Sequence, residues 1–349
     1  MQCALGYKHA GRVAVERPYL LFLGDVADQL AAKTGQGIAD WRPDWCVGQL
    51  RLAGCNADTG LADLTLDEAQ AKGAKTLIVA VANSGGTMPD HWTETITGAL
   101  ARGMDVASGL HTRLATIPGV AEAAAKHGRK LYDVRYSDRS FNTGKGFRRA
   151  GRRCLTVGTD CSVGKKYTAL AITREMERRG MKVDFRATGQ TGIFISERGV
   201  AIDAVVSDFI SGAAEWLTPE NEPDHWDVVE GQGSLFHAAF AGVTLGLLHG
   251  AQPDALVLCH EPTRKHMRGL PHAPIPELKD CFEPYLQMAA LTNPDCRFVG
   301  VSIDTHLLSR AAAERLLKST EDRFGLPCVD SLATGTGPIV DALEQLCGN

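Results

Sequence analysis

Residues 158–166 of the chain read Gly158-Thr159-Asp160-Cys161-Ser162-Val163-Gly164-Lys165-Lys166. The four residues before them, Cys-Leu-Thr-Val, are apolar or β-branched, which predicts a buried strand. Residues 167–179 have helical periodicity and end before Gly180, a residue typical of a helix C-terminus. A strand, a glycine-bounded loop and a helix in this order are typical of a phosphate-binding loop, or P-loop.

The chemistry of this loop predicts a phosphorylated cofactor. The N–H groups of such a loop and of the helix N-terminus bind phosphate oxygens, and a lysine adds positive charge. We therefore expect the following residues to bind cofactor phosphates: Gly158, Thr159, Cys161, Ser162, Val163, Gly164, Lys165 and Lys166. A Ser or Thr that holds Mg²⁺ normally follows the lysine, but Lys166 stands at that place. A lysine neutralises phosphate and does not ligate Mg²⁺, so we expect no metal.

The spacing of the loop also departs from the standard pattern. Gly158 lies one residue further from Gly164 than that pattern allows. P-loops similar to that of dethiobiotin synthetase share this spacing and also begin with Gly-Thr-Asp. An ATP- and Mg²⁺-dependent ligase or kinase of that type is therefore an alternative function, which the Lys166 position disfavours.

The composition is that of a globular protein. The chain has 349 residues, 44% hydrophobic and 22% charged, which is enough for two domains with full cores. Its net charge of −4 does not favour nucleic acid as a main partner. No apolar run has the length of a membrane span, and charged residues interrupt the N-terminal region where a signal peptide would lie. We expect a cytoplasmic protein that does not bind membranes.

Strand and helix signals alternate along the chain, which predicts an α/β fold with parallel sheets and helices on both faces. Residues 1–137 form an expected Rossmann-like domain, residues 138–153 a basic linker, and residues 154–349 a P-loop domain. Strands are expected in the first domain at 19–23, 76–82, 105–107 and 130–134, with helices at 90–102 and 120–127. Strands are expected in the second domain at 154–158, 182–187, 202–206, 226–230, 254–259 and 297–303.

Three acid–base side chains are candidates for proton transfer. Glu230 follows the strand at 226–230 and precedes Gly-Gln-Gly, a position where P-loop proteins carry an acid that supports a metal or a water. Without the loop hydroxyl we expect Glu230 to act as a general base, because an amine must lose a proton when it attacks a carbonyl. Asp160, inside the loop, and then His237 are the next candidates.

The remaining strand ends carry candidates for substrate binding. Ligands bind at the carboxyl ends of parallel strands, so the loops there are expected to converge with the P-loop. From these loops we expect Arg186, Thr188, Gln190, Gln232 and Arg264 to bind substrate. Arginine suits a carboxylate because its planar fork forms two hydrogen bonds with it. Arg268 could also bind a substrate carboxylate, but an ordinary surface charge is the favoured interpretation for it.

At this point the chain resembles a known family. The segments 158–165 (GTDCSVGK), 187–192 (ATGQTG), 230–235 (EGQGSL) and 242–250 (GVTLGLLHG) look like signatures of a bacterial and archaeal P-loop family that includes D-glutamate N-acetyltransferases of the DgcN type. The segments Gly109-Leu-His111 and Asp133-Val-Arg135 fit its N-terminal half, so the similarity covers nearly the whole chain.

The resemblance implies a function that agrees with the loop. It implies transfer of an acetyl group from acetyl-CoA to the amine of D-glutamate, in D-amino acid catabolism, by a protein with a Rossmann-like and a P-loop domain. Coenzyme A carries a diphosphate and a 3′-phosphate and needs no hydrolysis, which suits a loop with two lysines. A non-catalytic nucleotide-binding protein is the other alternative. A homo-oligomer is expected by default.

Overall fold

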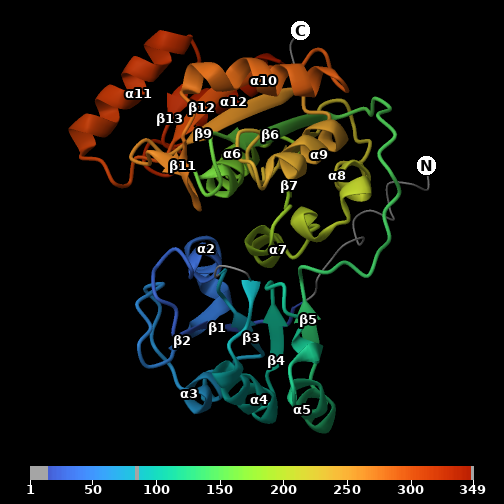
Figure 1. The fold of residues 1–349 in the computed structure, drawn as a ribbon, viewed down its shortest axis with the longest axis vertical. Helices are drawn as coiled ribbons and strands as arrows, with labels where there is room; N and C mark the ends of the chain where they lie inside the picture. Colours follow the sequence, from blue (N-terminus) through green and yellow to red (C-terminus); the bar gives the residue numbers. More distant parts are fainter. Residues whose placement is uncertain (1–14, 83–85, 347–349) are drawn as a thin grey trace. The chain divides into compact units, whose positions relative to one another are not determined.

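The computed structural model describes residues 15–82 and 86–346, and the chain divides into two compact units (Figure 1). Unit 1 comprises Met1–Asp138 and Gly189–Ala201, and unit 2 comprises Arg139–Thr188 and Ile202–Asn349. Each unit has its own parallel sheet, and helices cover the sheets as the sequence predicts. Within the described part of the chain, every helix is too short or too polar to span a membrane.

Unit 1 is built on a five-stranded sheet in the order β2-β1-β3-β4-β5. Its strands are β1 Tyr19–Gly24, β2 Cys46–Arg51, β3 Thr76–Val79, β4 Asp105–Ser108 and β5 Leu131–Asp133. Its helices are α2 Lys33–Trp41, α3 Leu66–Ala71, α4 Thr93–Ala101, α5 Val120–His127 and α7 Gln190–Ser196. Helix α7 packs against α2, so a segment from the second half of the sequence completes this unit.

Unit 2 contains a six-stranded parallel sheet in the order β13-β12-β9-β6-β8-β7. Its strands are β6 Arg152–Gly158, β7 Val183–Arg186, β8 Trp226–Val229, β9 Ala255–His260, β12 Arg297–Ile303 and β13 Cys328–Val329. Its helices are α6 Lys165–Arg178, α8 Ile210–Leu217, α9 Ala241–Ala251, α10 Leu278–Ala290, α11 Arg310–Phe324 and α12 Gly337–Gln345. The strands β10 His266–Met267 and β11 Leu270–Pro274 form a separate antiparallel hairpin.

Alternating side chains of β6 fill both halves of the unit 2 core. Cys154 packs with α6 and α12 on one face of the sheet, whereas Leu155 and Val157 pack with α9 and α10 on the other. Successive residues of a strand point to opposite faces, so a buried strand with helices on both faces is apolar at nearly every position. The P-loop strand therefore lies in the middle of the sheet, between β9 and β8.

Most predicted elements of secondary structure are present, but the strand predicted at 202–206 is wrong. Ile202–Ala204 form a 3₁₀ turn, and Val206 is 66% exposed. The β-branched run raised the local strand propensity, but no described strand pairs with it, and tertiary pairing decides whether a short run becomes a strand. The helix predicted at 90–102 is a 3₁₀ turn, Asp90–Trp92, followed by α4.

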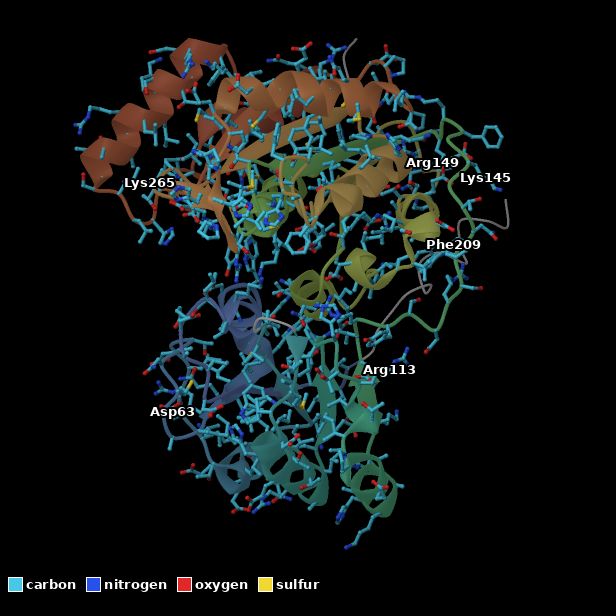
Figure 2. The ribbon with its side chains drawn as sticks, viewed as in Figure 1. Asp63, Arg113, Lys145, Arg149, Phe209 and Lys265 are labelled. Carbon is cyan, nitrogen blue, oxygen red and sulfur yellow. The ribbon has the colours of Figure 1, made fainter. Side chains whose placement is uncertain are left out.

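The basic segment before β6 follows the surface of unit 2 without regular secondary structure. The Arg149 guanidinium donates to the carbonyls of Thr218 (2.9 Å) and Gly250 (2.7 Å), at the ends of α8 and α9. The backbone N–H groups of Lys145 and Gly146 both donate to a Glu215 carboxylate oxygen at 2.7 Å (Lys145 and Arg149 are labelled in Figure 2). Burial lowers the pKa of Arg149 to about 10. The exact limits given above for the linker stay a prediction.

Candidate functional site

The P-loop connects the end of β6 to the first turn of α6. Ser162 (φ 52°) and Gly164 (φ 92°) have left-handed backbones, and Gly164 is the residue that precedes the helix. Left-handed residues in a tight turn direct successive N–H groups toward one concave side, which is a binding site for anions. The first N–H groups of α6 add to this site because they have no acceptor within the helix.

Lys165 lies under this loop. Its ammonium donates to the carbonyl of Asp160 at 2.6 Å, and the side chain is buried. Burial lowers the pKa of Lys165, because the charged form has lost its water. Lys166, by contrast, is half-buried, and its ammonium lies 4.8 Å from the centroid of the Tyr167 ring.

The loop after β8 presses against the P-loop. An ideal Cβ on Gly231 would lie 1.7 Å from the carbonyl oxygen of Thr156 and 3.0 Å from Cδ of Lys165, so a larger residue has no room there. The Gly231 N–H donates to the Thr156 hydroxyl at 2.9 Å. The Glu230 loop and the lysine of the P-loop are therefore immediate neighbours, as the strand ends predict.

Glu230 is buried at the end of β8 and lies next to two of the predicted substrate-binding residues. Its Oε2 accepts the Thr188 N–H at 3.0 Å, and its carbonyl accepts the Thr188 hydroxyl. The Gln232 amide donates to the Thr188 hydroxyl at 3.2 Å. The structure thus brings together Glu230, Thr188 and Gln232.

Asp160 is fully buried and ion-paired. Its Oδ2 accepts from the Arg264 guanidinium (2.7 Å) and from the Arg268 backbone N–H (2.8 Å), whereas Oδ1 has no hydrogen-bond partner among the described residues. Arg264 also donates to the carbonyls of Cys161 (2.7 Å) and Ser162 (3.0 Å). Arg264 therefore fixes the shape of the P-loop, and its charge matches that of Asp160.

His237 is buried, and backbone groups bind both of its ring nitrogens. Nδ1 accepts the Ala239 N–H at 3.2 Å, and Nε2 lies 2.9 Å from the carbonyl of Arg268. Nδ1 is an acceptor, so Nε2 carries the proton and donates it to the Arg268 carbonyl. In this tautomer the ring positions Arg268 and has no free lone pair for proton abstraction.

Arg186 is buried and lies in a cluster of charged side chains along β7 and β8, in which Asp227 is buried and Asp184 is partly exposed. Its guanidinium contacts Asp227 at 2.7 Å and Asp184 at 3.0 Å, and His225 lies 3.4 Å from Asp227. Burial by itself lowers the pKa of His225, but the carboxylates of Asp184 and Asp227 outweigh it and raise the pKa to about 9. Arg186 therefore has carboxylate partners within the protein, and a role in binding substrate stays a prediction.

Gln190 belongs to the other unit. It is the first residue of α7, and an ideal Cβ on Gly109 would lie 1.9 Å from its Oε1. The sequence predicts a loop at the end of β7 here, but residues 190–196 are helical. The structure groups Gln190 with Gly109 in unit 1, whereas Thr188, two residues earlier, belongs to unit 2.

Several residues that hold the site together were not predicted. Tyr285 of α10 donates its hydroxyl to the Gly158 carbonyl at 2.7 Å and accepts the Leu235 N–H at 3.2 Å. Burial raises the pKa of Tyr285 to about 12, so it stays a donor. The Thr159 hydroxyl lies 3.0 Å from Nδ1 of His260, whose pKa burial lowers. Nothing in the local sequence distinguishes Tyr285 from a core residue.

Two groups of side chains among the described residues have metal-ligand chemistry: Asp160, Cys161 and His237, and Asp184, His225 and Asp227. Each group already contacts a guanidinium, that of Arg264 in the first and that of Arg186 in the second. A divalent ion would have to replace that positive charge, so neither donor set fits a resident metal as it stands.

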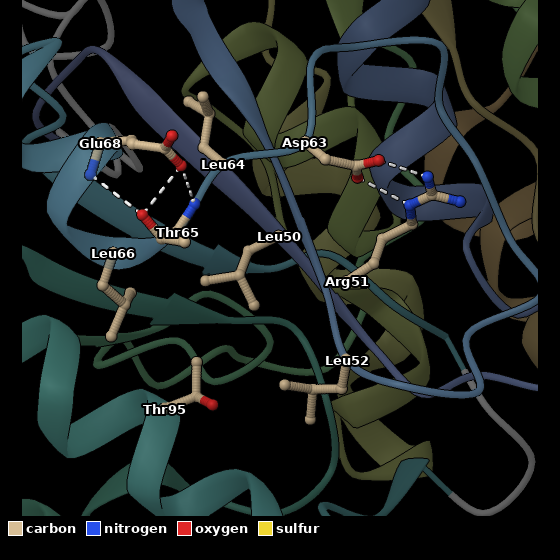
Figure 3. Close-up of a pocket in the computed structure, with 9 residues that line it drawn as sticks. All are labelled: Leu50, Arg51, Leu52, Asp63, Leu64, Thr65, Leu66, Glu68 and Thr95. Carbon is tan, nitrogen blue, oxygen red and sulfur yellow. Dashed lines mark hydrogen bonds and ion pairs between the residues drawn. The ribbon is translucent and has the colours of Figure 1, made fainter.

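A separate hollow of about 390 Å³ lies in unit 1 beside β2 (Figure 3). Leucines 50, 52, 64 and 66 line it, together with Arg51, Asp63, Thr65, Glu68 and Thr95. Arg51 pairs with Asp63, and Thr65 and Glu68 form the capping box of α3. These four side chains have structural roles, and the hollow contains none of the predicted site residues.

Comparison with known proteins agrees with this architecture. Residues 140–340 match the family described as "Domain of unknown function (DUF1611_C) P-loop domain", and residues 50–137 match "Domain of unknown function (DUF1611_N) Rossmann-like domain". The crystal structure of a DUF1611 family protein from Anabaena variabilis superposes with a TM-score of 0.86 at 31% identity, and the match covers 95% of this chain and 100% of that one.

Two relatives have a named activity. A D-glutamate N-acetyltransferase of Tritonibacter scottomollicae is 54% identical over 332 residues, which is 95% of this chain and 100% of the relative. A D-glutamate N-acetyltransferase of a Pseudoalteromonas species is 49% identical over 326 residues, which is 93% of this chain and 98% of the relative. The resemblance found in the sequence motifs is confirmed. This chain belongs to the DUF1611 family and is similar over nearly its whole length to these two D-glutamate N-acetyltransferases.

Proposed function

We propose that this protein is a D-glutamate N-acetyltransferase that takes its acetyl group from acetyl-CoA. The observation that carries the proposal is the 54% identity, over 95% of the chain, to a relative of that activity. The P-loop supports acetyl-CoA as the donor, because two lysines and the N-terminus of α6 suit the phosphates of coenzyme A. Phosphate binding by residues 158, 159 and 161–166 is part of the proposal.

In the proposed reaction the amine nitrogen of D-glutamate attacks the thioester carbon of acetyl-CoA. The new C–N bond forms, the C–S bond breaks, and coenzyme A leaves with its sulfur as thiolate, which is then protonated. A base must accept the proton that the nitrogen loses. N–H groups of the loop stabilise the negative charge that develops on the carbonyl oxygen.

We assign the base to Glu230. It is buried beside Gly231, whose backbone lies against Lys165, and so it lies close to the proposed donor site. Asp160 and His237 are weaker candidates, since Arg264 pairs with the first and backbone groups bind both nitrogens of the second. Thr188 and Gln232, next to Glu230, are the proposed contacts to the amino acid.

The test is release of free thiol from acetyl-CoA by the purified protein. D-glutamate, L-glutamate and D-aspartate are compared in parallel, each with EDTA and with Mg²⁺, and mass spectrometry identifies the acetylated product. Release with D-glutamate in both buffers is expected. If no thiol is released with any of the three amino acids, and ADP is formed from ATP in the presence of Mg²⁺, a ligase or kinase is favoured instead. Tight nucleotide binding without turnover would favour a non-catalytic binding protein.

A cytoplasmic location, a role in D-amino acid catabolism and a homo-oligomeric state are further parts of the proposal. The first two follow from the proposed substrates, which are small intracellular metabolites. The third is a default expectation, because most oligomeric proteins are symmetric assemblies of identical chains. Size-exclusion chromatography with light scattering measures the oligomeric state directly.

A further inference from the structure

Arg268 lies in the turn of the β10–β11 hairpin and is held from both sides of its peptide backbone. Its N–H donates to the buried carboxylate of Asp160 at 2.8 Å, and its carbonyl accepts from His237 at 2.9 Å. Arg264, four residues earlier, ties the start of the same segment to the P-loop carbonyls. Two predicted bases, Asp160 and His237, therefore position a residue that the sequence suggests is a surface charge.

The side chain of Arg268 returns to the P-loop. One Nη donates to the hydroxyl of Ser162, the residue with a left-handed backbone at the tip of the loop. Arginine has five N–H donors, and among the described residues Nε and the second Nη of Arg268 have no hydrogen-bond partner. These donors are available beside a loop built to bind anions.

In the part of the chain that the structure describes, the cations around the P-loop outnumber the carboxylates that pair with them. Arg264 is matched by Asp160 at 2.7 Å and by Glu261 at 3.7 Å. Lys165 donates to a neutral carbonyl and Arg268 to a neutral hydroxyl, and among the described residues no carboxylate pairs with either side-chain cation. The positive charge of Arg264 also contributes to the lowered pKa of Lys165, after burial. A bound anion would balance these cations.

We infer that Arg268 binds a phosphate group of the acyl donor, in the role that Mg²⁺ has in nucleotide-hydrolysing P-loops. Lys166 stands where those loops carry the metal-binding hydroxyl, and an arginine fixed at the loop tip supplies positive charge without a metal. The inference rests on the proposed function for the identity of the donor. The planar guanidinium suits two phosphate oxygens at once, which lysine cannot match.

The experiment compares binding of coenzyme A by calorimetry in EDTA for the wild type, R268A, R268K and K265A. Lys265 is an exposed residue just before the same hairpin (labelled in Figure 2) and serves as the matched control for loss of one positive charge. We expect R268A to weaken binding about 10- to 100-fold, because hydrogen bonds between charged groups are the strongest polar contacts. R268K should recover part of the affinity, and K265A should change it less than about threefold.

Two further measurements distinguish a direct contact of Arg268 with the phosphate from an effect of the substitution on the fold. R268A should raise KM for acetyl-CoA and leave KM for D-glutamate and the urea midpoint unchanged. The titration is repeated with dephospho-coenzyme A, which lacks the 3′-phosphate. If R268A still binds this compound more weakly than the wild type by the same factor, Arg268 contacts the diphosphate. If the two proteins bind it equally, Arg268 contacts the 3′-phosphate. If R268A and K265A bind coenzyme A as tightly as the wild type, the inference is overturned.

Failure of the proposed function is distinguishable from failure of this inference. If the wild type does not bind coenzyme A, the proposed donor is wrong, and the same variants are titrated with ADP. Weaker ADP binding by R268A in EDTA still supports Arg268 as a phosphate ligand. Equal ADP binding by R268A and the wild type overturns the inference in that case too.

Discussion

The hydroxyl of Tyr285 on α10 donates to the carbonyl of Gly158, the first residue of the P-loop, at 2.7 Å. The same oxygen accepts the Leu235 N–H at 3.2 Å, so one buried side chain connects the P-loop to the loop that follows β8. We expect Y285F to lower the free energy of unfolding by about 1–3 kcal/mol, since it leaves a buried carbonyl unsatisfied. Urea unfolding measures the change, and Y132F, at a partly exposed tyrosine of unit 1, is the control. A loss below 0.5 kcal/mol, on the order of a surface change, would contradict a bracing role.

Replacement of Gly231 by alanine is expected to damage the site through sheer lack of space. The new Cβ would lie 1.7 Å from the Thr156 carbonyl oxygen, and so the loop after β8 must move away from Lys165. Overpacking of this kind typically costs about 1–3 kcal/mol. G242A, on α9, is the control: no atom of the residues that the structure describes lies within 4 Å of that Cβ, and alanine should stabilise the helix by about 0.5–1 kcal/mol. Thermal melts showing equal effects for both variants would exclude the steric argument.

Loss of the P-loop lysine is expected to abolish tight donor binding. K165A removes a buried ammonium next to the N-terminus of α6, and we expect coenzyme A to bind about 100-fold more weakly. Calorimetry measures Kd, and circular dichroism confirms that the fold is intact. K318A, on the exposed face of α11, should bind like the wild type. An unchanged Kd for K165A would remove the case for cofactor binding by this loop.

The assignment of the base predicts a large effect of E230Q on kcat. Glutamine keeps an oxygen that can accept the Thr188 N–H but cannot take a proton, so we expect kcat to fall about 10²- to 10⁴-fold. KM for acetyl-CoA should change little. E215Q, at a half-buried glutamate that accepts N–H bonds from residues 145 and 146, is the control. If E230Q kept the full kcat across the pH range, Glu230 would not be the general base, and Asp160 would be the next candidate.

The cluster of charged side chains around Arg186 in unit 2 predicts a pH dependence of stability. The pKa of His225 is about 9 in the folded protein and about 6.5 when unfolded, so its stabilising contribution is complete below pH 6.5 and disappears as pH rises toward 9. We expect H225Q to cost roughly 1 kcal/mol at pH 6, after allowance for solvent screening. Urea unfolding at pH 6 and pH 9 measures the difference.

The control for this prediction is H306Q, which changes an exposed histidine and should leave the stability unaltered at both pH values. A cost for H225Q that is the same at pH 6 and pH 9 would show that the carboxylates of Asp184 and Asp227 do not hold the proton. If the loss of stability caused by H225Q were larger at pH 9 than at pH 6, the protonated form of His225 would not be the stabilising one.

The P-loop itself was predictable because its signals are local. The strand, the two glycines, Lys165 and the following helix lie within about 25 consecutive residues, and each follows from periodicity or backbone conformation. The position of Glu230 was predictable for a related reason, since it directly follows a buried strand of a parallel sheet. The strand predicted at 202–206 failed because its sequence has strand propensity but no partner strand.

Other features depend on contacts between distant residues. Arg268 and Asp160 are 108 positions apart, and their hydrogen bond exists only because the β10–β11 hairpin folds back on the P-loop. Likewise, α7 lies in the P-loop half of the sequence but packs with α2 of unit 1. No periodicity or spacing in the chain reports such pairings.

The sequence by itself determined the α/β architecture, the P-loop with a lysine in place of the metal-binding hydroxyl, and the family. These depend on hydrophobic periodicity, glycine conformation and residue chemistry, which are properties of short segments. Only the tertiary structure decided which charges are already paired. In the folded chain Arg186 and Arg264 pair with carboxylates, and the tautomer of His237 is fixed. Arg268 keeps N–H donors at the loop that have no partner among the described residues. Whether two charges pair depends on their burial and on distances of a few ångströms between residues that are far apart in the chain. The burial and the distances are set only when the sheet and the helices pack.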